Sequence, residues 1–117
     1  MKRTYASAMA VMAICIYLLS CSKDGDGNNT VDCNNVSNKA FAADVNPIIQ
    51  SSCNVTGCHA TGSTNGPGPL TNYTQVFNAR TAIRIAVSSG TMPKASSLPT
   101  SQKNSIICWI DSGAPNN

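Results

Sequence analysis

The sequence lacks glutamate, and only 11% of its 117 residues are charged. It has no cluster of lysines and arginines to neutralise a run of phosphates, which excludes a nucleic-acid-binding protein. Its one histidine, His59, excludes sites that need several histidines. Only 5% of the residues are aromatic, so a single small domain has little material for a core. Domains of this kind usually need a disulfide, a metal or a cofactor for stability.

The first 21 residues have the layout of an export signal. A short positive start precedes the apolar run 8–19, which is too short to span a bilayer as a helix. The run ends at Leu19-Ser20-Cys21, which resembles a bacterial lipobox, whose cysteine carries the lipid. The alternatives are an ordinary signal peptide with a chance cysteine, or an uncleaved anchor. We expect a signal peptide over residues 1–20, a lipidated Cys21 and a flexible tether over residues 21–40.

The residue after the lipobox cysteine indicates which membrane the lipoprotein reaches. It is Ser22 rather than aspartate, which in lipoproteins of this type implies passage to the outer membrane. We therefore expect a lipoprotein of the bacterial cell envelope, anchored in the outer membrane and facing the periplasm or the cell surface. Unpaired thiols tend to oxidise in these compartments.

Residues 41–117 show helical spacing and no strand alternation, which predicts an all-α domain of short helices and long loops. Asn46 is expected to cap the first helix, with Pro47 at its first position. A helical turn is expected over residues 72–77. Asn78 is expected to cap a second helix over residues 79–87.

The last helix is expected to begin at Thr100 as its cap and to stop at Gly113, with Pro115 just beyond. It carries Trp109, one of the four aromatic residues that remain after the export signal. Because the core contains few large side chains, the domain needs a disulfide or a bound group for stability.

The motif that carries chemistry is Cys53-x4-Cys58-His59. The usual haem attachment motif is C-x-x-C-H, in which two thiols add to the haem vinyl groups and the adjacent histidine binds the iron. The gap here is two residues longer. The alternatives are a local Cys53–Cys58 disulfide, two separate structural disulfides, or a zinc site completed by Cys33 or Cys108. Zinc is disfavoured because an exported thiolate site must survive oxidation.

Four further segments follow one another in a characteristic order. They are Pro47-Ile48-Ile49-Gln50-Ser51-Ser52-Cys53, Leu70-Thr71-Asn72-Tyr73, Met92-Pro93 and Trp109-Ile110-Asp111-Ser112-Gly113-Ala114. With the Cys-His motif, this order resembles the class I cytochrome c domain. It resembles more closely the short haem modules of bacterial envelope cytochromes. The resemblance covers residues 44–115.

The resemblance implies a role for each matched residue. Cys53 and Cys58 would attach one haem c covalently, His59 would be its proximal iron ligand and Met92 its distal ligand. Ligation by histidine and methionine raises the reduction potential of haem iron. The carbonyl of Pro67 or Pro69 would accept a hydrogen bond from Nδ1 of the histidine and so orient its ring.

The resemblance also implies a pairing for two other cysteines. Cys33 and Cys108 would remain after haem attachment, and the first and last helices of a class I cytochrome c cross one another. A Cys33–Cys108 disulfide is therefore expected in an oxidising compartment.

The function implied is that of a monohaem c-type cytochrome. It would be an electron carrier rather than an enzyme, meeting redox partner proteins transiently and the membrane through its lipid. Two alternatives remain. One is a haem-free, disulfide-stapled surface lipoprotein that binds a ligand; the other is a haem sensor or enzyme whose distal ligand is labile.

Overall fold

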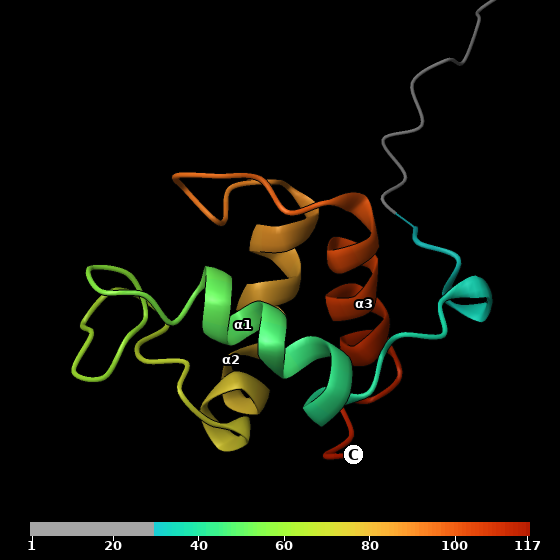
Figure 1. The fold of residues 1–117 in the computed structure, drawn as a ribbon, viewed down its shortest axis with the longest axis horizontal. Coiled ribbons are helices and arrows are strands. Elements are labelled where there is room, and N and C mark those ends of the chain that lie inside the picture. The colour runs from blue at the N-terminus through green and yellow to red at the C-terminus, as the bar shows by residue number, and fades with distance from the viewer. Residues whose placement is uncertain (1–29) are drawn as a thin grey trace, which may run out of the picture.

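The computed structural model describes residues 30–117; the expected signal peptide, Cys21 and the first part of the tether lie outside them. The elements in chain order are η1 (Cys33–Asn35), η2 (Phe41–Val45), α1 (Asn46–Ser52), α2 (Tyr73–Ser88) and α3 (Thr100–Asp111). Residues 30–117 contain no strand, so the all-α prediction is confirmed for this part of the chain. α3 packs on α2 and on η2, and two long loops project on the side away from α3 (Figure 1).

The first helix begins earlier than predicted. η2 is a π-helical turn that runs directly into α1, so Asn46 lies inside a helical segment and is not its N-cap. The segment begins after Ala40, whose N–H donates to the Asp44 carboxylate at 2.9 Å. Phe41 and Val45 are both buried, and this burial favours the extra turn.

The second helix is one element rather than a turn followed by a helix. Asn72, not Asn78, is its N-cap, because the Asn72 side-chain oxygen accepts from the N–H of Gln75 at 3.1 Å. The buried stripe of α2 comprises Val76, Ala79, Ile83 and Val87. Asn78 is exposed on the opposite face, where an asparagine inside a helix costs little.

The last helix begins at the predicted residue but without the predicted cap. Pro99 is at the N-cap position, and no side chain caps the helix. The predicted stop at Gly113 is confirmed, since its φ of 94° is the left-handed conformation that glycine adopts at helix ends. The N–H of Ala114 then donates back to the Trp109 carbonyl at 2.9 Å.

All four aromatic residues of the described chain form one connected cluster. The ring of Phe41 lies 5.2 Å from Trp109 and 5.0 Å from Tyr73, and Tyr73 lies 5.6 Å from Phe77. The Arg80 guanidinium covers the outer face of Phe77 at 4.0 Å. Trp109, at one end of this cluster, is fully buried and is the largest fully buried side chain of the core.

The C-terminal segment closes this cluster with hydrogen bonds. The indole N–H of Trp109 donates to the carbonyl of Pro115 at 2.8 Å, and the Tyr73 hydroxyl donates to that of Ala114 at 3.0 Å. Asn117 accepts from the backbone N–H groups of Phe41 and Ala42. The end of the chain thus joins α3 to α2 and to the start of η2.

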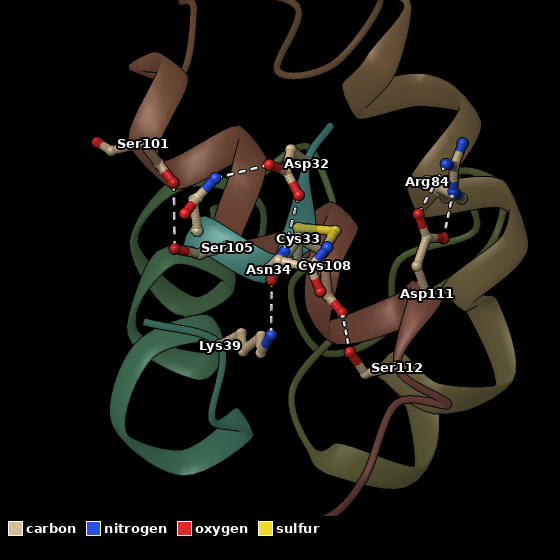
Figure 2. Close-up of a disulfide and its surroundings, with 11 residues drawn as sticks. Asp32, Cys33, Asn34, Lys39, Arg84, Ser101, Ser105, Cys108, Asp111 and Ser112 are labelled. Carbon is tan, nitrogen blue, oxygen red and sulfur yellow. Dashed lines mark hydrogen bonds and ion pairs between the residues drawn. A yellow bond between two sulfur atoms is a disulfide. The ribbon is translucent and has the colours of Figure 1, made fainter. Parts of the chain in front are cut away.

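The predicted Cys33–Cys108 disulfide is present and joins the segment before η2 to α3 (Figure 2). Each bridged residue also accepts a side-chain hydrogen bond on its carbonyl, from Lys39 at 2.8 Å and from Ser112 at 2.7 Å. Nearby, Asp111 on α3 accepts two hydrogen bonds from the Arg84 guanidinium on α2, which lower the pKa of that carboxyl.

Removing this disulfide should strongly destabilise the domain. The bridge closes a loop with a sequence separation of 75, for which the chain-entropy model gives about 4 kcal/mol. We expect the double variant Cys33→Ala, Cys108→Ala to unfold at a clearly lower urea concentration than the parent chain. The variant Ser37→Ala is the control, because Ser37 is exposed in the same segment. Equal midpoints for parent and double variant would contradict the stabilising role.

Candidate functional site

The candidate site begins where α1 ends. α1 stops at Ser52, and the N–H of Cys53 still donates to the carbonyl of Ile49 at 2.9 Å, so the helix sets the direction in which the next segment leaves. A loop over residues 53–72 then leads to α2 (Figure 1). The Cys-His motif thus begins at the end of a short helix. Its residues Ile48 and Ile49 are buried and fix the helix in place.

The six residues from Cys53 to Cys58 form a closed turn that accommodates the long spacing. The carbonyl of Cys53 accepts from the N–H of Val55 at 2.9 Å and from that of His59 at 3.1 Å. The N–H of Cys58 donates to the Val55 carbonyl at 2.9 Å. Gly57 has a φ of 82°, which a residue with a side chain rarely adopts. The extra residues are therefore looped out, and His59 returns to the carbonyl of the first cysteine.

Cys53 and Cys58 are the unpaired cysteines among residues 30–117. Cys53 is half-buried and Cys58 is exposed. Burial, and secondarily the proximity of Cys58, raise the pKa of the Cys53 thiol above its ordinary value. In the structure Cys53 and Cys58 are not bonded to each other, whereas Cys33 and Cys108 are.

His59 is buried, with 6% of its surface exposed. Its Nδ1 lies 2.9 Å from the carbonyl oxygen of Gly68. The prediction that Pro67 or Pro69 supplies this carbonyl is wrong: the residue between them does so. Gly68 has no side chain and therefore adopts a φ of 102°, which allows the turn that aims its carbonyl inward.

This hydrogen bond selects the tautomer of the neutral ring. A carbonyl oxygen only accepts, so Nδ1 of His59 must carry the proton and Nε2 must carry the lone pair. No hydrogen bond from within residues 30–117 reaches Nε2, which is in contact with solvent, since no buried side-chain nitrogen or oxygen in this part of the chain lacks a partner. A buried imidazole with Nδ1 held by a carbonyl and Nε2 unused has the arrangement of a metal-ligating histidine.

Leu70 connects the histidine to α1. Its N–H donates to the His59 carbonyl at 2.9 Å, and its own carbonyl accepts from the Gln50 side chain at 3.2 Å. Gln50 in turn accepts from the side chain of Asn54, just after Cys53, at 2.5 Å. The side chain of Leu70 is buried. Three of the segments that carry the sequence resemblance are therefore linked by hydrogen bonds.

Asn65 holds the other end of the motif, and the sequence analysis did not identify it. Its side-chain amide donates to the carbonyls of Gly57 and Cys58 at 2.9 and 3.0 Å. The backbone carbonyl of Asn65 accepts from the N–H of Gly68 at 2.5 Å. The Ser63 hydroxyl also donates to the Cys58 carbonyl. Asn65 thus ties the second cysteine to the turn whose carbonyl orients the His59 ring.

Met92 lies in a different loop, between α2 and α3. It is half-buried, and its N–H donates to the carbonyl of Ala86 at 3.2 Å. The loop projects on the same side of the helices as the loop over residues 53–72 (Figure 1). A backbone hydrogen bond joins His59 to Cys53, whereas no backbone hydrogen bond within the described chain joins Met92 to either of them.

The zinc alternative has no ligand set. The cysteines that would have completed it, Cys33 and Cys108, are bonded to each other. In the part of the chain that the structure describes, no three histidine, cysteine or acidic side chains come together.

No protein-family model, curated protein or solved structure matches this chain. Its function is therefore inferred from its residues and their geometry.

The Asn65 contacts lead to a stability prediction. Asn65→Ala removes two side-chain hydrogen bonds in a largely exposed loop, and we expect it to lower the free energy of unfolding by about 1 kcal/mol. Thr64→Ala is the matched control, because Thr64 is the exposed neighbour. Thermal unfolding of the parent chain and both variants measures the difference. Identical melting temperatures for Asn65→Ala and Thr64→Ala would contradict a specific role for the amide.

Proposed function

We propose that this protein is a monohaem c-type cytochrome that transfers single electrons. Cys53 and Cys58 attach the haem, and His59 is its proximal ligand through Nε2. When bound, the haem supplies an iron centre that alternates between two oxidation states. The helical domain over residues 41–117 is, in this proposal, a small cytochrome c-like fold.

The observation that carries the proposal is the state of His59 beside two unpaired thiols. The ring is buried, its Nδ1 is bound to the Gly68 carbonyl, and Nε2 is not used by residues 30–117. Cys58, directly before His59, and Cys53 both have unpaired thiols. The carbonyl of Cys53 accepts from the His59 N–H. A thiol pair next to an oriented imidazole is what covalent haem attachment requires.

The donor set also fits a haem better than a bare ion. A porphyrin contributes four nitrogens of its own, so the protein needs to provide only one or two axial ligands. This agrees with the lack of a cluster of three ligating side chains among residues 30–117. The unpaired thiols contrast with the Cys33–Cys108 bridge, which implies a different use for the pair at 53 and 58.

Met92 is proposed as the distal ligand. It is the methionine of the described chain, it is half-buried, and its backbone is tied to the end of α2 through Ala86. A thioether opposite His59 would occupy the last position on the iron. A closed iron favours electron transfer over catalysis, which is why the carrier is proposed ahead of an enzyme or a sensor.

The location is proposed on sequence grounds. The lipobox-like Cys21 would anchor the protein in the cell envelope, with the outer membrane as the expected site. Among residues 30–117 no helix has the length and hydrophobicity needed to cross a bilayer. The lipid would then be the contact with the membrane, and the domain would meet redox partner proteins.

Covalent haem is tested by pyridine haemochrome spectroscopy on the exported chain. We expect a c-type α-band from the parent chain and no covalent haem from His59→Ala or from the double variant Cys53→Ala, Cys58→Ala. Thr61→Ala, at an exposed residue of the same loop, should retain the band. A parent chain that folds, is exported and shows no band would reject the proposal and favour the haem-free binding lipoprotein.

The distal ligand is tested separately with Met92→Ala. This variant should keep the covalent haem, because both thiols and His59 remain. Its reduction potential should fall, because a thioether ligand raises the potential. Its reduced form should bind carbon monoxide, whereas the reduced parent should not. Lys94→Ala in the same loop is the control. A parent that binds carbon monoxide without denaturation would favour the sensor or enzyme alternative.

A further inference from the structure

The candidate site lies within a long stretch without charge. Residues 45–79 contain no aspartate, glutamate, lysine or arginine. This stretch holds both thiols, His59, and the segments that orient it. The charged residues of the described chain are Asp32, Lys39, Asp44, Arg80, Arg84, Lys94, Lys103 and Asp111.

The part of this stretch that reaches solvent is the loop around the second cysteine. We call residues 54–66 the neutral loop face. Val55 is 39% exposed, and Thr56, Gly57 and Cys58 are exposed beside it. The loop surrounds an open hollow of about 360 Å³ whose lining, Thr56–Cys58 and Ala60–Asn65, is uncharged. The surface is therefore polar through hydroxyl and amide groups, and Val55 is its one large apolar side chain.

The neutral loop face is also accessible from solvent. The described chain enters beside α3, where the Cys33–Cys108 bridge holds it, and the loop over residues 53–72 projects on the other side of the helices (Figure 1). The C-terminal residues lie against η2 and the aromatic cluster. Neither end of the described chain covers the loop.

We propose that the neutral loop face is the docking surface of the protein, and that its partner is a redox protein with an uncharged contact surface. The proposal rests on the proposed function, because an exposed Cys58 brings a haem edge to this face. Opposite charges usually steer redox encounters and reject wrong partners. A face without charge offers no such steering, and a charged partner surface would lose hydration there without gaining an ion pair.

A second copy of this chain provides the simplest partner of that chemistry. When an oxidised and a reduced copy exchange an electron, two neutral loop faces meet. NMR line broadening measures the rate of this exchange. We expect the exchange rate of the haem-loaded parent to change less than twofold between low and high ionic strength. Residues 30–117 carry five basic and three acidic side chains, so two copies repel only weakly at low salt, and this weak repulsion is all that added salt can screen.

Added charges make the test specific. Two copies of Thr56→Lys should exchange about threefold more slowly than the parent at low salt, because like charges then meet at the contact. High salt should restore the rate, and so should a mixture of Thr56→Lys with Thr56→Asp. The same substitutions at Asn116, which is exposed next to the C-terminus, are the matched controls and should leave the rate unchanged.

Two results would overturn the docking proposal while leaving the cytochrome intact. One is a parent rate with a strong salt dependence; the other is an equal effect of charge at residues 56 and 116. The absence of a c-type α-band would instead reject the proposed function, and the docking proposal with it. The haem spectrum of each variant, recorded first, separates these outcomes.

Discussion

The burial of Trp109 is the interaction on which the domain depends. With so few aromatic residues, the chain cannot build a core from several independent clusters, and it places one fully buried indole at the point where three segments meet. Phe41 contacts it from η2, and the indole N–H is satisfied by the Pro115 carbonyl. A buried donor without that acceptor would be costly, so the chain after α3 must turn back. Gly113 and Ala114, both with positive φ, make that turn.

The site depends on this core through α1 rather than directly. η2 contacts α3, and α1 continues η2 without a break, so the position of Cys53 follows from the packing of Phe41 and Val45. The second anchor is Leu70, which is buried and whose backbone binds both His59 and Gln50. The loop between these anchors is largely exposed. Its geometry is maintained by hydrogen bonds of Asn65 and Ser63 rather than by packing.

Much of the fold could be predicted because periodicity and helix-ending residues carry it. The three helices and the stop at Gly113 follow from these patterns, whereas the Cys33–Cys108 pair follows from the resemblance to the cytochrome c domain. Helix starts were harder. Asn46, Asn78 and Thr100 are all residue types that cap helices, yet α1 continues from η2, α2 is capped by Asn72 and α3 has Pro99 at its N-cap position. At the first helix, the Asp44 carboxylate accepts from the Ala40 N–H and allows an extra turn, η2. The sequence Asn46-Pro47 after this turn predicts a later helix start.

The residues around His59 show a different limit. The motif Cys53-x4-Cys58-His59 is recognisable from the spacing of its residues, and a backbone hydrogen bond joins His59 to Cys53 in the structure. Whether Gly68 or a neighbouring proline orients the ring depends on which carbonyl points inward, and that is a property of backbone angles in a loop with two Gly-Pro pairs. Asn65 gave no signal in the sequence, because asparagine is common in such loops and its role is visible only through its two carbonyl partners.

What matters about the long spacing between the cysteines is how the segment returns His59 to Cys53, rather than how many residues it contains. What a haem site needs is an imidazole at a constant position relative to two sulfurs. In this chain His59 is located by its own N–H on the Cys53 carbonyl, by Leu70 on its carbonyl and by Gly68 on its ring. None of these three contacts involves Asn54, Thr56 or Gly57, so added residues at these positions extend the surface without moving the histidine. The same insertion creates the exposed, uncharged loop. The feature that departs from the usual motif is therefore also the one that would give the site its own contact surface.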